Sequence, residues 1–161
     1  MSISKKIVLI GHFGVGKSSL IRRFVENTFT DNYKVTIGVH ILKKEIEIPK
    51  NEKMSLIIWD LEGNDDITKT RASYLLGTHG FIYVFDLTRP ETYALLEGDL
   101  EYLKTNYPNT PTKVVGNKAD LVTKEFIKQG EAFNTLTHFF TSAKTGTRVE
   151  KLFTTLAKDL I

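Results

Sequence analysis

The sequence contains no cysteine among its 161 residues. This absence excludes a disulfide framework, a thiolate metal site and a cysteine nucleophile. A chain of this length still buries enough apolar surface to fold without disulfides or structural metals. The composition is that of an ordinary globular protein, and the missing cysteine fits a reducing compartment, so we expect a cytoplasmic location.

Long apolar runs are also missing. The run at residues 7–10 is shorter than the roughly 7–15 residues of a signal-peptide core. No stretch approaches the ~20 apolar residues of a membrane span. The sequence has no prenylatable cysteine and no glycine at position 2 for myristoylation. We expect no membrane anchor in this chain, and peripheral membrane association only if a lipidated tail is missing from it.

Neither sign of charge dominates the sequence. The formal net charge is +3, spread along the chain. A balance this mild does not point to nucleic acid, so we expect no nucleic-acid partner. The length suits one domain, and no repeat or linker interrupts it. We therefore expect a single domain over residues 1–161 that exists as a monomer.

Apolar runs bounded by turn residues alternate with stretches of helical spacing. Strands are predicted over residues 7–10, 39–48, 54–59, 81–85, 113–115 and 138–140. Helices are predicted over residues 18–26, 68–76, 91–105, 123–135 and 148–160. A turn at residues 49–52 makes the second and third strands an antiparallel hairpin. This order predicts an α/β fold, with a six-stranded, mostly parallel sheet, one antiparallel edge strand, and helices on both faces.

A glycine-rich turn follows the first strand directly. Residues 11–18 read GHFGVGKS, which is the P-loop pattern in its required place between a strand and a helix. Its glycines let backbone N–H groups turn toward phosphate oxygens, and the following helix adds the positive end of its dipole. Lys17 supplies a charge to the phosphates, and the Ser18 hydroxyl suits Mg²⁺. A chance match is expected in roughly one of two hundred such sequences, so we predict a P-loop NTPase fold.

Two further motifs follow later strands. Residues 116–120 read GNKAD, and residues 141–144 read TSAK. Guanine presents N1–H and its 2-amino group on one edge, and the Asp120 carboxylate can accept both in a charge-assisted contact. Adenine lacks this pair of donors. Alone, each motif is an ordinary surface turn, but both lie after strands, downstream of a P-loop, where ligands bind in open α/β sheets.

Together these motifs resemble those of the Ras superfamily of small GTPases, and the resemblance covers nearly the whole chain. Residues 60–63 (DLEG) match the family's D-x-x-G motif, and residues 29–38 (FTDNYKVTIG) resemble its first switch segment. Residues 36–39, 58–60 and 84–88 look more like the Rab branch than Ras or Rho. Outside this context, Phe29 and Thr36 would be interpreted as a core aromatic and a strand threonine.

The resemblance implies a site for GTP or GDP with Mg²⁺. The nucleotide would contact Phe13, Gly14, Val15, Gly16, Lys17, Ser18, Ser19, Phe29, Tyr33, Thr36, Asp60, Gly63, Asn117, Lys118, Asp120, Ser142, Ala143 and Lys144. Mg²⁺ would be held by Ser18, Thr36 and, through water, Asp60. GTP would order the segments around Thr36 and Asn64, which would then contact effectors, exchange factors and activating proteins.

Two departures from the family pattern concern hydrolysis, in which Lys17 and the residue after D-x-x-G are the catalytic candidates. That residue is usually a glutamine that orients the attacking water, and here it is Asn64. Asparagine is shorter by about 1.5 Å, and a misplacement of about 1 Å can cost on the order of a hundredfold in rate. Phe13 stands where the family has small residues and would crowd the same space. We therefore predict slow hydrolysis.

Three functions remain open at this point. The first is a nucleotide-gated switch that hydrolyses GTP slowly. The second is a non-enzymatic, Rab-like interaction module held in one nucleotide state. The third is a P-loop kinase or ATPase, which leaves Asn117 and Asp120 without a role. Arg22, Arg23 and Arg71 are possible internal arginine fingers, but helical arginines usually pack by their stems and face solvent.

Overall fold

The computed structural model of the chain describes residues 2–30 and 36–161. The predicted role of Tyr33 therefore lies outside the described residues. Within these residues, six strands form one sheet in the order β2-β3-β1-β4-β5-β6. They are β1 (Ser2–Ile10), β2 (Val39–Ile48), β3 (Glu52–Leu61), β4 (Gly80–Asp86), β5 (Thr112–Asn117) and β6 (Phe139–Phe140).

The pairing of the strands confirms the predicted sheet. β2 is an edge strand and pairs antiparallel with β3 over ten residue pairs, from Val39 opposite Leu61 to Ile48 opposite Glu52. The other four pairings are parallel. β1 begins five residues before the predicted strand because its first half also pairs with β3.

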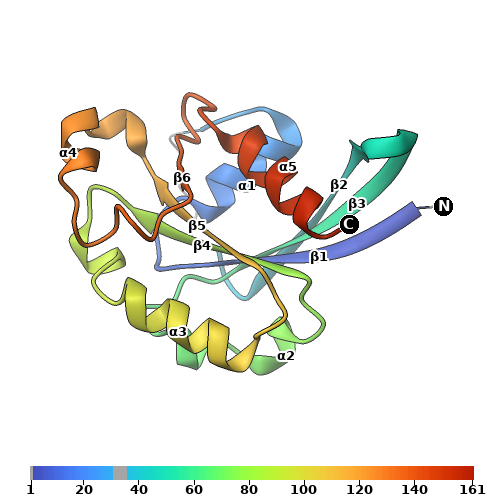
Figure 1. Cartoon of the computed structure of the whole chain (residues 1–161), viewed down its shortest axis with the longest axis horizontal. Coiled ribbons are helices and arrows are strands. Elements are labelled where there is room, and N and C mark those ends of the chain that lie inside the picture. The colour runs from blue at the N-terminus through green and yellow to red at the C-terminus, as the bar shows by residue number, and fades with distance from the viewer. Residues whose placement is uncertain (1, 31–35) are drawn as a thin grey trace.

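In the described part of the chain, five α-helices connect or follow the strands. They are α1 (Lys17–Glu26), α2 (Ala72–Leu75), α3 (Leu96–Asn106), α4 (Lys124–Lys128) and α5 (Val149–Asp159). In Figure 1, α1 and α5 lie on one side of the sheet, while α2 and α3 lie on the other. Each side has its own buried apolar cluster, with stacked Phe24 and Phe153 on the first and Phe85 with Phe133 on the second. Helices on both faces confirm the predicted layers.

Three predicted helices are shorter than their sequence patterns suggest. The predicted helix 68–76 is wrong in its first half, because Thr70 and Arg71 have extended backbone between the 3₁₀ turn Ile67–Lys69 and α2. α3 begins at residue 96 instead of 91, since Pro90–Thr92 forms a 3₁₀ turn of its own.

The predicted helix 123–135 ends as α4 at Lys128. Beyond it, Phe133 is buried against the backbone of Gly130, where a Cβ would lie 2.1 Å from the phenylalanine ring. Phe133 also packs against Phe85 and Tyr93, with ring centroids 5.6 Å and 5.1 Å apart, so contacts with distant segments override the helical spacing. None of the helices in the described parts of the chain has the length and apolar character needed to cross a bilayer.

Candidate functional site

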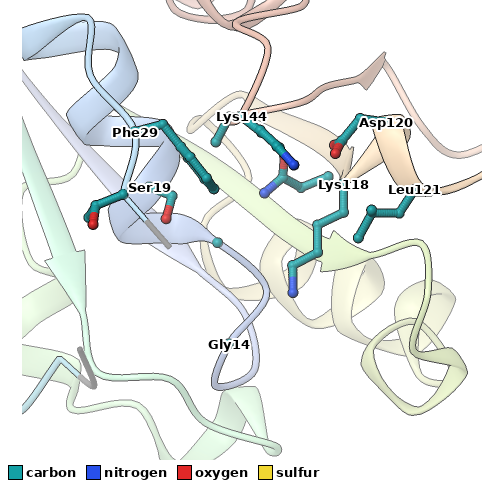
Figure 2. Close-up of a pocket in the computed structure, with 11 residues that line it drawn as sticks. Gly14, Ser19, Phe29, Lys118, Asp120, Leu121 and Lys144 are labelled. Carbon is teal, nitrogen blue, oxygen red and sulfur yellow. The ribbon is translucent and has the colours of Figure 1, made fainter. Parts of the chain in front are cut away.

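The predicted motifs meet at one edge of the sheet. The loops that follow β1, β3, β5 and β6 lie at the carboxyl ends of their strands, where open α/β sheets bind ligands. A cavity of about 370 Å³ opens there, a size that suits a small-molecule site. Its lining includes Gly14 and Gly16 on one side and Asp120, Ala143 and Lys144 on the other. Figure 2 shows Phe29 entering this cavity across from Lys118 and Asp120.

The P-loop backbone needs its glycines. Gly14 and Gly16 have φ angles of 71° and 100°, which residues with a side chain rarely adopt. A Cβ at Gly16 would lie 2.2 Å from Nδ2 of Asn117. That amide donates to the Val15 carbonyl at 3.0 Å and accepts from the Thr141 hydroxyl at 3.0 Å. Asn117 thus joins the P-loop to both loops that carry the base motifs.

Lys17 is a buried cation inside the P-loop. Only 6% of it is exposed, and its amine donates to the carbonyls of Gly11 at 3.0 Å and His12 at 2.9 Å. Burial lowers the pKa of Lys17 to about 8, an effect that the charge of Asp60 partly offsets. Two neutral carbonyls do not neutralise an ammonium group, so this site favours an anionic ligand.

Three side chains with oxygen atoms converge beside Lys17. The Ser18 hydroxyl donates to Oδ2 of Asp60 and lies 2.8 Å from the Thr36 hydroxyl, which lies 3.3 Å from the same carboxylate oxygen. Oδ1 of Asp60 is buried and has no hydrogen-bond partner within residues 2–30 and 36–161. Burial raises the pKa of this carboxyl, whereas Ser18, Lys17 and Thr36 act in the opposite direction. An unpaired carboxylate oxygen among hydroxyls fits a hard cation such as Mg²⁺.

The candidate base pocket is built from the two later loops. Asp120 is exposed, and its Oδ1 accepts from the Ser142 hydroxyl at 2.8 Å. The backbone N–H of Ala119 donates to the Thr141 carbonyl at 2.9 Å, which holds the two loops together. Nζ of Lys118 lies 2.8 Å from Oδ2 of the buried Asp86 carboxylate, an ion pair that the sequence did not indicate.

The segment after β3 lies directly against the P-loop. Gly63 is buried, and a Cβ there would lie 2.5 Å from the backbone nitrogen of Phe13. The N–H of Asn64 donates to the Gly11 carbonyl at 3.0 Å. Its side-chain oxygen accepts from the N–H of Asp66 at 3.1 Å, so the amide is engaged by its own loop.

Phe13 lies at the border of two cavities. Phe13 is 46% exposed and lines both a small pocket beside Lys17 and Ser18 and a cavity of about 370 Å³ next to Asp65 and Arg89. Arg89 donates to the Phe13 carbonyl at 2.7 Å, and Nε2 of His12 lies 3.3 Å from the Asp65 carbonyl. Both contacts connect the P-loop with neighbouring loops.

Most of the predicted nucleotide residues lie around two adjoining pockets, the candidate base pocket and a smaller pocket beside Lys17. The pocket linings contain Phe13, Gly14, Gly16, Lys17, Ser18, Ser19, Phe29, Thr36, Asp60, Gly63, Asn117, Lys118, Asp120, Ala143 and Lys144. Val15 has a fully buried side chain, so only its backbone can face a ligand, and Ser142 lies behind Asp120. The sequence did not indicate that Thr30 and Leu121 line the larger pocket. It also did not indicate that Arg23 donates to the Ala143 carbonyl or that Arg89 donates to the Phe13 carbonyl.

Comparison with known proteins agrees with the geometry of these pockets. Residues 6–161 match the sequence model of the Ras family. Rab-1 from Theileria annulata, a Ras-related protein, is 37% identical over 164 aligned residues, which cover 96% of this chain and 73% of the relative. Rab-1 from Theileria parva is 36% identical with the same coverage. The chain therefore belongs to the Ras family of small GTP-binding proteins and, within that family, to the Rab branch.

Proposed function

We propose that this protein is a switch that binds GTP and GDP together with Mg²⁺ and hydrolyses GTP slowly. One observation carries the proposal: P-loop glycines and the Asp120 carboxylate line the same cavity of about 370 Å³. A phosphate-binding loop alone serves many nucleotides. A carboxylate facing the same cavity supplies the acceptor that guanine needs and adenine cannot use.

In this proposal the phosphates lie against the curled backbone of residues 14–16 and the buried amine of Lys17. Ser18, Thr36 and Asp60 would hold Mg²⁺, because their oxygens converge and Oδ1 of Asp60 is unpaired within the described ranges. The ion would neutralise phosphate charge and bridge the phosphates to the protein. Nucleotide binding would thereby draw Thr36 and Gly63 toward the same ligand, which couples the two switch segments.

Calorimetry would test the binding part of this proposal. We expect micromolar or tighter binding of GDP and GTP in the presence of Mg²⁺, weaker binding after chelation with EDTA, and ATP binding at least about a hundredfold weaker. A preference for ATP, or no measurable affinity for either guanine nucleotide, would contradict the proposal.

Slow hydrolysis follows from the way Asn64 is held. Its amide oxygen accepts from Asp66 in its own loop, and its side chain is one methylene shorter than glutamine. We expect Asn64→Gln to raise the single-turnover rate of GTP hydrolysis by about tenfold to a hundredfold, because the longer amide can reach the attacking water. Rapid-quench measurement of phosphate release would check this.

Two further variants identify which residue limits the rate. Asn109→Gln makes the same chemical change at an exposed position and should leave the rate unchanged. If Asn64→Gln has no effect but Phe13→Gly accelerates hydrolysis, crowding by Phe13 limits the reaction. Wild-type turnover as fast as that of an ordinary Rab protein would disprove slow hydrolysis altogether.

A non-enzymatic, Rab-like interaction module is the second candidate function. The observation that favours it is the same Asn64 contact, which turns the amide toward Asp66 and away from a catalytic role. Chromatography of the nucleotide released from the purified protein, followed by a multiple-turnover assay, separates the candidates. A trapped nucleotide with no turnover supports the module.

We also propose that effectors and regulators bind where the two switch segments meet. A groove of about 330 Å³ lies between Ile37 and Gly38 on one side and Glu62, Asn64 and Arg71 on the other. The N–H of Glu62 donates to the Gly38 carbonyl at 2.8 Å, so the groove's shape depends on both segments. Ile37 is 84% exposed, which suits an apolar contact with a protein partner. We propose that the protein binds these partners as a monomer and that it does so in the cytoplasm.

A further inference from the structure

Arg23 connects the helix that follows the P-loop to the TSAK loop. Its guanidinium donates to the Ala143 carbonyl at 2.8 Å through Nε and to the Lys144 carbonyl at 2.6 Å through Nη2. The remaining nitrogen, Nη1, lies 3.3 Å from the side-chain oxygen of Asn27, the residue that caps α1. The contact with Asn27 therefore fixes the orientation of the guanidinium group relative to the end of α1.

Two successive carbonyls can meet one guanidinium only if the backbone between them is curled, because they alternate in direction along an extended chain. Within the described residues, the N–H groups of Ser142, Thr145 and Gly146 donate inside this loop, whereas those of Ala143 and Lys144 have no hydrogen-bond partner. Ala143 and Lys144 both line the candidate base cavity. Arg23 thus holds the carbonyls of the two cavity-lining residues whose N–H groups are free to donate to a ligand.

Arg23 also lies on the helix that begins with Lys17 and Ser18. Six residues of helix separate Arg23 from Lys17, which corresponds to about 9 Å along one rigid element. The same helix therefore carries phosphate-binding groups at its start and the support of the base loop two turns later.

We propose that Arg23 is a positioning residue for guanine recognition, which fixes the backbone N–H of Ala143 toward the O6 carbonyl of the base. This inference rests on the proposed binding of guanine nucleotides. Arg23 does not touch the ligand and acts through the two carbonyls of the TSAK loop. Loss of its fork would loosen the loop and weaken contacts at O6, but it would leave those at Asp120 in place.

Release of a fluorescent GDP analogue would test the proposal. We expect Arg23→Gln to release it about tenfold faster than the wild type, since two charge-assisted hydrogen bonds are lost. Arg23→Lys keeps the charge but lacks the planar fork, so it should fall between the two. Arg22→Gln is the matched control, because Arg22 is also partly buried on the same helix and has no hydrogen bond or ion pair within the described parts of the chain.

A base analogue distinguishes positioning from general loss of structure. The diphosphate of 6-thioguanosine keeps both donors to Asp120 but replaces O6 with sulfur, a weaker acceptor. The wild type should prefer GDP to this analogue, and Arg23→Gln should lose most of that preference. An unchanged preference, or equal release from the Arg23→Gln and Arg22→Gln variants, would overturn the inference. If the wild type itself failed to bind GDP, the proposed function would fail first.

Discussion

Replacement of Lys17 by methionine is expected to weaken GTP binding by about 10²–10³-fold and, at the same time, to stabilise the ligand-free protein. Lys17 is 6% exposed, and within residues 2–30 and 36–161 its amine has only two carbonyls at hydrogen-bond distance. Burial lowers the pKa of Lys17 from 10.5 to about 8, which corresponds to about 3 kcal/mol of unfavourable burial in the folded state. Methionine has similar length and no charge to desolvate.

The pH dependence of this effect has a defined sign. The unfolded chain binds a proton at Lys17 more tightly than the folded chain, so the penalty is fully present below about pH 8. It shrinks as the pH rises from about 8 toward 10.5. We therefore expect Lys17→Met to raise the free energy of unfolding by about 1–2 kcal/mol at pH 7, after loss of the two hydrogen bonds, with a smaller gain at pH 10.

Urea unfolding of nucleotide-free protein in EDTA, with calorimetric titration of GTP, would measure both effects. Lys104→Met is the matched control, because Lys104 is exposed on α3 and its replacement should change stability by less than about 0.5 kcal/mol. Destabilisation of the Lys17→Met variant at pH 7, or GTP affinity within tenfold of the wild type, would contradict this account of the buried amine.

Replacement of Asp120 by asparagine is expected to change base preference from guanine to xanthine. The Asp120 carboxylate lies on the base cavity and is braced by the Ser142 hydroxyl at 2.8 Å. An amide has one oxygen instead of two, so it cannot pair one oxygen with N1–H and the other with the 2-amino group of guanine. Its NH₂ group can donate to the carbonyl that xanthine carries at position 2. We expect GDP affinity to fall by about 10²–10³-fold and xanthosine diphosphate to bind more tightly than GDP.

Competition between the two diphosphates for a fluorescent nucleotide would measure this exchange of preference. Glu131→Gln changes the net charge by the same amount at an exposed site and should leave the preference for GDP intact. If Asp120→Asn bound GDP as well as the wild type does, recognition of the guanine edge would have to lie elsewhere in the cavity.

Elements with strong local patterns were predictable. The bounds of β2 match the predicted strand because apolar residues alternate along an edge strand, and the β2–β3 hairpin follows from the turn at residues 49–52. Helix lengths were less predictable. Phe133 has the spacing of a continued helix, yet it lies outside α4 and packs against Phe85 and Tyr93, which are distant in the sequence.

The phosphate-binding loop could be identified from eight adjacent residues, because its glycines and its lysine all lie within one short stretch of chain. The base motifs are equally local, so their residue types could be identified without a structure. Their spatial relations could not. Arg23 and Ala143 are 120 residues apart, and the convergence of Ser18, Thr36 and Asp60 depends on how two loops meet beside β1. Contacts between distant segments follow from sheet order and packing, and only the tertiary structure decides them.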